Sequence, residues 1–145
     1  MSAFVVRPAS SADVAAIDAL VRARPFTAKW SAQALRDELA RVDSIFLVAE
    51  QGRVRGYALA RLPAEEAQLL DFAVAEDGKG IGRALWRGML RVVKSRGAKR
   101  LTFEVSENNA RARLFYAAAG AKVVGRREKF YDDGSAAFLM DLALA

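Results

Sequence analysis

Cysteine and histidine are both absent from this chain of 145 residues. Without cysteine the chain has no disulfide, no thiolate nucleophile and no cysteine-ligated metal. Without histidine it has neither a Ser-His-Asp triad nor an HExxH zinc site, and we expect no bound metal. Any acid–base chemistry therefore has to come from aspartate, glutamate, tyrosine, lysine or a chain terminus.

Long apolar runs are absent too. None approaches the roughly 18 residues that a membrane span needs, and the first ten residues, MSAFVVRPAS, lack the charged and apolar regions of a signal peptide. We therefore expect a cytoplasmic protein with no membrane partner. The apolar content of 53% excludes a disordered chain. The length predicts one domain over residues 1–145 and leaves the oligomeric state open.

The spacing of apolar residues predicts an α/β fold with the element order β-α-α-β-β-β-α-β-α-β-β. Strands are expected at residues 4–6, 45–49, 54–62, 67–75, 101–106, 121–127 and 136–143. Helices are expected after the capping signal Ser10-x-x-Asp13, after Ser31, over residues 83–96, and from Asn108 or Asn109 to Gly120. In the second helix, Leu35, Leu39 and Val42 are expected on one face.

Three glycines, Gly78, Gly80 and Gly82, join the strand at 67–75 to the following helix. Glycines let the backbone approach a ligand closely, and a helix N-terminus offers free N–H groups and the positive end of the helix dipole. The loop is not a Walker loop, because no Gly-Lys-Ser/Thr closes it, and Leu85 breaks the G-x-G-x-x-G pattern. The loop therefore indicates an anion site of another kind.

The net charge is +6, and a run of basic residues follows the glycine loop. Between residues 78 and 100 there is no acidic residue, and there are eight basic ones: Lys79, Arg83, Arg87, Arg91, Lys94, Arg96, Lys99 and Arg100. A solvated helix face is the ordinary explanation of such a run. Beside the glycine loop, a phosphate-rich cofactor explains both features. A non-catalytic RNA- or ribosome-binding module stays an alternative, although Trp86 is the only aromatic residue within the run.

Two segments carry a resemblance to a known family. Residues 70–85, LDFAVAEDGKGIGRAL, resemble the acetyl-CoA-binding motif of the GNAT N-acetyltransferases, in which Q/R-x-x-G-x-G/A joins a strand to a long helix. Asp77 stands where the family has Gln or Arg. Residues 101–116, LTFEVSENNARARLFY, are similar to the family's next strand–helix unit. The resemblance implies a mixed central β-sheet flanked by helices on both faces, with the cofactor in the splay after the glycine strand.

Within the family, three stretches are similar to the ribosomal-protein alanine N-acetyltransferase group: residues 30–39, the Glu104-to-Tyr116 run, and residues 126–134. The resemblance implies that the pantetheine arm of acetyl-CoA lies along Phe72, Ala73 and Val74, with Asn109 near it. It assigns the pyrophosphate to the amides of Lys79, Gly80, Ile81, Gly82, Arg83 and Ala84. On the acceptor side it points to Phe26, Trp30 and Tyr131, with Lys29 and Phe130 beside them.

Transfer of an acetyl group from a thioester to an amine needs a base for the amine and an acid for the departing thiolate. Without histidine or cysteine, a carboxylate is the natural base and a tyrosine the natural acid. The resemblance points to Tyr116 as the acid and to Glu104 as the base. Asp71, the one charged residue in its apolar strand, is either a rival base or a structurally paired group.

The expected function is acetyl-CoA-dependent N-acetylation of a primary amine. The expected acceptor is the N-terminal amine of a peptide or protein, with a ribosomal protein as one candidate and no specific nucleic acid partner. The alternatives are a small-molecule amine acetyltransferase, the RNA- or ribosome-binding module, and a CoA-binding regulator without activity.

Overall fold

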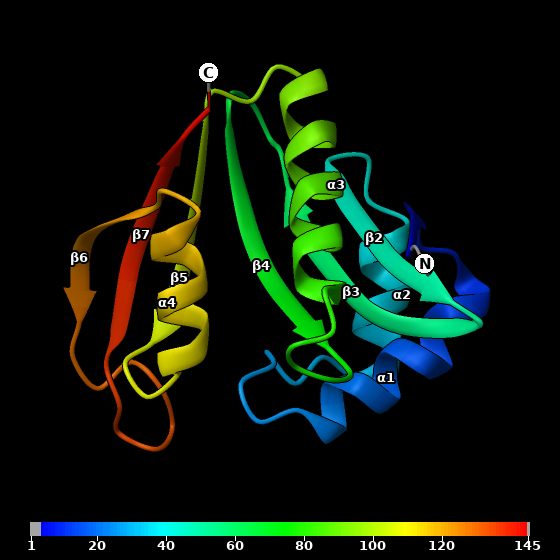
Figure 1. Cartoon of the computed structure of the whole chain (residues 1–145), viewed down its shortest axis with the longest axis horizontal. Helices are drawn as coiled ribbons and strands as arrows, with labels where there is room; N and C mark the ends of the chain where they lie inside the picture. The colour runs from blue at the N-terminus through cyan, green and yellow to red at the C-terminus, as the bar shows by residue number, and fades with distance from the viewer. Residues whose placement is uncertain (1–3, 145) are drawn as a thin grey trace.

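The computed structural model describes residues 4–144, which form one seven-stranded sheet in the order β1-β2-β3-β4-β5-β7-β6 (Figure 1). All neighbouring strands are antiparallel except β4 and β5, which are parallel. The sheet is therefore mixed, as expected. Its strands are β1 (Val5–Pro8), β2 (Ser44–Gln51), β3 (Arg53–Arg61), β4 (Glu66–Val74), β5 (Arg100–Ser106), β6 (Lys122–Arg127) and β7 (Ala137–Ala143).

Four α-helices and a short 3-10 helix cover the two faces of the sheet. The helices are η1 (Ser11–Asp13), α1 (Val14–Ala23), α2 (Ala32–Leu39), α3 (Ile81–Ser95) and α4 (Ala110–Ala118). Buried residues of α3 and α4 belong to one apolar core and those of α1 and α2 to another. In Figure 1, α3 and α4 lie in front of the sheet and α2 passes behind it. The prediction of helices on both faces is confirmed.

Side-chain caps set the starts of two helices. The side chain of Ser31 accepts the amide of Ala34 at 3.0 Å, and that of Asn109 accepts the amide of Ala112 at 3.2 Å, so Asn109 rather than Asn108 caps α4. The expectation for Val42 is wrong. Helix α2 ends at Leu39, the chain turns away, and Val42 is 98% exposed.

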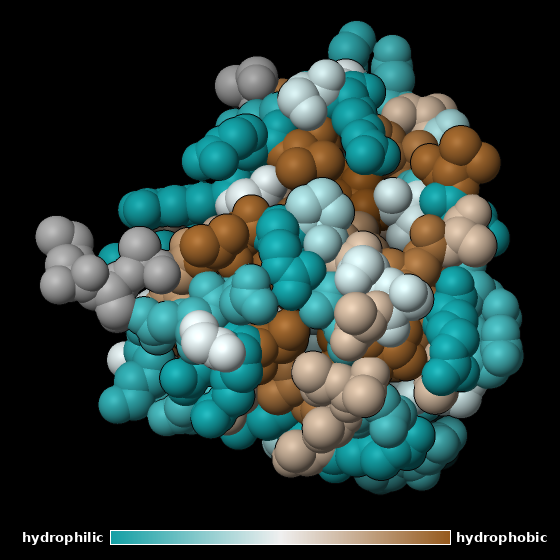
Figure 2. Space-filling model, turned by 90° about the vertical axis from the view of Figure 1, so that its right-hand side faces the viewer, coloured by the Kyte–Doolittle hydropathy of each residue, from teal (hydrophilic) through white to brown (hydrophobic). Residues whose placement is uncertain are grey.

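In the part of the chain that the structure describes, the surface beside β2 and β3 shows no single large apolar patch (Figure 2). Figure 2 shows the face at the β2–β3 side of the sheet, where hydrophobic residues lie in separate spots among hydrophilic ones. Scattered apolar residues of this kind are normal on a protein surface. Among the helices of residues 4–144, none has both the length and the apolar content needed to cross a membrane. The features that point to a function lie instead between β4 and β5.

Strands β4 and β5 separate soon after they begin. They pair only from Glu66 opposite Arg100 to Gln68 opposite Thr102. Beyond that point the edge of β4 that faces β5 has no partner strand, and its backbone N–H and C=O groups are free for a ligand. Figure 1 shows the two strands diverging toward the loop that leads into α3.

A β-bulge in β4 decides which side chains face which helices. Leu59 of β3 lies opposite Asp71, but the next residue, Ala60, lies opposite Leu69, so Leu70 is an extra residue. A bulge interrupts the alternation of side chains along a strand. As a result, Asp71 points toward the α1–α2 face of the sheet, where it meets Tyr57.

Candidate active site

A cavity of about 1400 Å³ occupies the space between β4 and β5. It exceeds the 300–1,000 Å³ of ordinary small-molecule pockets, so it has room for a large cofactor and an acceptor together. The α1–α2 loop (residues 24–31) and the β6–β7 loop (residues 128–136) close its sides. The predicted site residues that line it are Phe26, Asp71, Phe72, Ala73, Val74, Gly80, Ile81, Gly82, Arg83, Glu104, Asn109, Tyr116 and Tyr131.

Three predicted residues do not line the cavity: Lys79, Ala84 and Trp30. The side chain of Lys79 is exposed to solvent. The amide of Ala84 already donates to the carbonyl of Gly80 at 3.1 Å, so it is not free for a phosphate. The indole of Trp30 packs against the α1–α2 core, and its N–H donates to Asp71 at 3.0 Å.

The glycine loop has the geometry expected of an anion site. Gly78 and Gly80 have φ angles of +76° and +83°, in the left-handed region that favours glycine. Helix α3 begins at Ile81, and the amides of its first turn lack partners within the helix. These amides and the positive end of the helix dipole face the cavity that Gly82 and Arg83 line.

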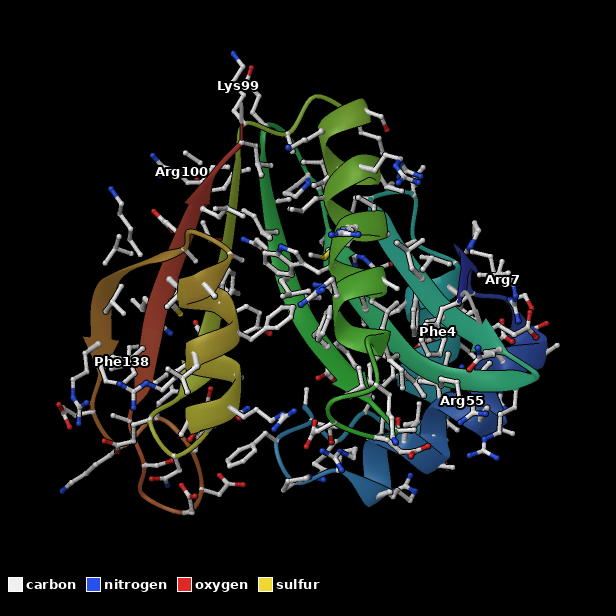
Figure 3. All side chains as sticks on the ribbon, viewed as in Figure 1. Phe4, Arg7, Arg55, Lys99, Arg100 and Phe138 are labelled. Carbon is white, nitrogen blue, oxygen red and sulfur yellow. The ribbon has the colours of Figure 1, made fainter. Side chains whose placement is uncertain are left out.

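The run of eight basic residues is not one site. Only Arg83 among them lines the cavity. Helix α3 has 15 residues and is about 22 Å long, so its last basic residues lie far from the glycine loop. Lys99 and Arg100 lie at the opposite end of the sheet (Figure 3), where Lys99 is 3.6 Å from Glu65 and Arg100 is 3.9 Å from Glu66. A cofactor in the cavity therefore explains only the first part of this run.

Two arginines that the sequence analysis did not single out meet at the glycine loop. Asp77 accepts a hydrogen bond from Arg24 at 3.0 Å, and the guanidinium of Arg111 lies 3.4 Å from its other oxygen. The two cations compensate the charge of Asp77 at this end of the cavity. The sequence could have indicated Arg111 as a site residue, because it stands in the first turn of α4, where the helix dipole disfavours a cation.

Tyr116 is held by an aromatic cluster that fills the wedge between the diverging strands. Its ring centroid lies 4.4 Å from that of Phe103, 5.5 Å from Trp86 and 5.6 Å from Phe115. Burial, with a smaller effect of the Asp71 charge, raises the pKa of Tyr116. Its hydroxyl therefore keeps its proton through the neutral range, and within residues 4–144 it has no hydrogen-bond partner.

Glu104 reaches the cavity from the other side of the sheet. Its neighbours Leu101, Phe103 and Val105 point into the α3–α4 core, so Glu104 points away from it. Its side chain is 37% exposed, and its one charged partner in the described residues is Arg127, 3.7 Å away. Much of this carboxylate is open to the cavity.

Asp71, the rival base, is enclosed. One of its oxygens accepts hydrogen bonds from the Tyr57 hydroxyl at 2.6 Å, the Trp30 indole at 3.0 Å and the Ala28 amide at 3.1 Å. The other accepts the amide of Phe72 at 2.9 Å. Burial raises the pKa of Asp71, and the four donors limit this rise because they stabilise the charged form.

The arrangement places a proton donor and a proton acceptor on opposite faces of the sheet. Tyr116, on helix α4, comes from the α3–α4 face, Glu104, on β5, points to the other face, and both line the cavity between β4 and β5. A group threaded through this gap meets both side chains. Such a site can transfer a group from a leaving atom on one side to a nucleophile on the other.

Two proteins of known or assigned activity are similar to this chain in sequence. The ribosomal protein bS18-alanine N-acetyltransferase of Escherichia coli is 30% identical over 88 residues, which span 59% of this chain and 60% of that protein. A Bacillus subtilis protein is 29% identical over 125 residues, 83% of each chain. Its name assigns it the same activity, but only provisionally.

Solved structures share the fold, among them the following two. The crystal structure of the Escherichia coli ribosomal-protein-S18-alanine N-acetyltransferase has a TM-score of 0.87 at 24% identity and covers 99% of this chain and 95% of that one. The PaiA N-acetyltransferase of Thermoplasma acidophilum, in complex with coenzyme A, has a TM-score of 0.82 at 21% identity and covers 98% and 99%.

A family model settles the membership. Residues 15–121 match the model described as the acetyltransferase (GNAT) family, which is most of the chain. This protein therefore belongs to the GNAT family and is an N-acetyltransferase, that is, an acyltransferase.

Proposed function

We propose that this enzyme uses acetyl-CoA to acetylate the N-terminal α-amine of a peptide or protein, in the manner of a ribosomal-protein alanine N-acetyltransferase. The observation that carries the proposal is the cavity between β4 and β5, with the glycine loop at one end and Tyr116 and Glu104 on its two sides. The names of the relatives and the coenzyme A complex of a fold neighbour support it.

The residues present fit acetyl-CoA. The free edge of β4 along Phe72–Val74 offers backbone groups to an amide-bearing arm, and the first-turn amides of α3 suit a pyrophosphate. Gly82 is informative here. A Cβ atom at this position would make only ordinary contacts of 3.7 to 3.9 Å, so packing does not require glycine. The missing side chain leaves room for a ligand instead.

In the proposed chemistry, the base and the acid act from opposite faces of the sheet. Glu104 takes a proton from the acceptor ammonium, directly or through a water, and the neutral nitrogen attacks the thioester carbonyl. As the C–N bond forms, the C–S bond breaks, and Tyr116 donates its proton to the leaving sulfur. Because the pKa of Tyr116 is raised, its hydroxyl reaches this step protonated. The new amide nitrogen then loses its second proton to water, Tyr116 regains a proton from solvent, and Glu104 releases its own to solvent.

The acceptor is proposed from the loops at the cavity mouth and from the relatives. Phe26, Phe130 and Tyr131 lie on the α1–α2 and β6–β7 loops and line the cavity. They present apolar and aromatic surface to a chain that enters beside Glu104. We propose that residues 1–145 act as one domain, and that the enzyme works in the cytoplasm, where a ribosomal protein would meet it.

The test is a panel of acceptors with release of free CoA followed over time. Peptides with a free N-terminal alanine should be acetylated, and the same peptides with a blocked N-terminus but a free lysine should not. Turnover only with polyamines or other small amines would favour the small-molecule alternative. If calorimetry shows no binding of acetyl-CoA or CoA at millimolar concentration, the proposal fails.

A further inference from the structure

The α1–α2 loop is tied to helix α1 by its own side chains. The hydroxyl of Thr27 donates to the carbonyl of Val21 at 2.6 Å. The ammonium of Lys29, a residue with a φ of +58°, donates to the carbonyls of Val21 at 3.0 Å and Arg24 at 2.6 Å. These bonds shape the loop but do not fix its position relative to the sheet.

A single carboxylate joins the same loop to β4. In residues 4–144, both hydrogen bonds from the loop to β4 go to Asp71, one from the amide of Ala28 and one from the indole of Trp30. Asp71 is itself anchored in the sheet by the hydroxyl of Tyr57, which is fully buried. The chain of contacts runs from β3 through β4 to the wall of the cavity.

This geometry favours a structural role for Asp71 over proton transfer. Three of the four donors described above converge on one oxygen, and the amide of Phe72 donates to the other, so both oxygens are engaged in structural contacts. A buried charge is costly unless it is hydrogen-bonded in this way. The bulge at Leu70 turns Asp71 toward the donors of the α1–α2 loop and toward Tyr57.

We propose that Asp71 is a positioning residue, which holds the α1–α2 loop, through Trp30 and Ala28, in the conformation that receives the acceptor. This inference rests on the proposed function, because the loop lines the acceptor side of the proposed site. Loosening the tether should weaken acceptor binding, while the affinity for acetyl-CoA and the pH profile of turnover stay as in the wild type.

Trp30→Phe tests the tether from the loop side, because it removes the indole N–H and keeps an aromatic ring. Hydrogen exchange of the amides in residues 24–31 should become faster, and KM for the acceptor should rise about three- to tenfold, as expected for one lost hydrogen bond. kcat should change by less than about twofold. Tyr57→Phe removes a bond to the same oxygen from the sheet side. It should lower Tm but speed exchange in the loop less than Trp30→Phe does.

Substitutions of Asp71 complete the test. Asp71→Ala removes both carboxylate oxygens, to which the loop donates, and should raise the KM for the acetyl acceptor most. Asp71→Asn keeps one carbonyl oxygen and should raise this KM less. Unchanged exchange of residues 24–31 in Trp30→Phe would overturn the proposal. So would a hundredfold loss of kcat in Asp71→Asn with loss of the alkaline limb, because that is the behaviour of a base. If the wild type acetylates no amine, the proposed function fails, and the exchange data still decide whether the tether exists.

Discussion

The two strands that bound the cavity each carry a carboxylate toward the same face of the sheet, but in opposite surroundings. On β4, Asp71 is buried beneath a loop and accepts four hydrogen bonds. On β5, Glu104 is open to the cavity, with Arg127 beside it. If Glu104 is the base, as proposed, then burial and a raised pKa do not by themselves mark a catalytic base. A base also needs a free lone pair that the substrate can reach.

The loops beside these strands repeat the contrast. The α1–α2 loop is held by the buried Asp71, whereas the β6–β7 loop is held by Glu107, just after β5. Glu107 accepts the amide of Ala136 at 2.6 Å and pairs with Arg126 at 3.0 Å. These two partners, in that order, lower the pKa of Glu107, while burial raises that of Asp71. The contributions of Asp71 and Glu107 to stability should therefore change with pH in opposite directions.

The largest effect is expected on the β5 side, at the proposed acid. Tyr116→Phe removes only the hydroxyl and keeps the ring in its aromatic cluster. kcat should fall by roughly 10²- to 10⁴-fold, the usual contribution of a positioned acid or base. Calorimetry should find the affinity for acetyl-CoA unchanged. Wild-type turnover in this variant would mean that another group, or solvent, protonates the sulfur.

A comparable loss of kcat is expected at the catalytic base, and it distinguishes Glu104 from Asp71. If Glu104 is the base, Glu104→Gln should lower kcat within the same range and remove the limb of the pH–rate profile that rises toward alkaline pH. Asp71→Asn should keep that limb. The reverse result would make Asp71 the base and would break the comparison drawn above. Full activity in both variants would mean that the amine arrives neutral and that positioning carries the catalysis.

A smaller effect, on acetyl-CoA binding, is expected at the glycines of α3, where Leu can replace either Gly82 or Gly88. Gly82→Leu fills the space proposed for the cofactor and should weaken acetyl-CoA binding by about ten- to a hundredfold, as overpacking does. Its Tm should not fall. Gly88→Leu is the matched control, because a Cβ there would lie 2.6 Å from Val6. It should lower Tm and leave the affinity of the folded protein unchanged. A drop in Tm for Gly82→Leu would favour a packing role for that glycine.

The smallest effect is a pH dependence of stability, which has opposite signs for Asp71 and Glu107. The folded-state pKa of Asp71 is raised, so its carboxyl contributes most to stability in acid, and the contribution falls as the pH rises above about 4. The pKa of Glu107 is lowered, so its contribution is present above about pH 4 and is lost in acid.

Thermal melts between pH 3 and pH 8 measure this difference. Relative to the wild type, Asp71→Asn should be better tolerated at the upper end of the range than at the lower end. Glu107→Gln should cost stability at neutral pH and little at pH 3. Parallel curves for the two variants would show that the anchors do not differ in the way described.

The sequence by itself determined the local features of this protein. The element order, the cap at Ser31, a cap at Asn108 or Asn109 and the glycine loop before α3 were all predicted, because each depends on residues within a few positions of one another. The same is true of the outward direction of Glu104, which follows from the alternation of its strand. The motifs also predicted the family that the comparisons confirmed.

Only the tertiary structure decided what depends on distant contacts. Trp30 and Asp71 are 41 positions apart, so nothing local could show that the indole holds the carboxylate instead of lining the cavity. Likewise, Arg24 meets Asp77 across 53 positions. The basic run, continuous in sequence, is divided because a helix carries its two ends far apart in space. The bulge at Leu70, which turns Asp71 toward the loop, exists only in the pairing of β4 with β3.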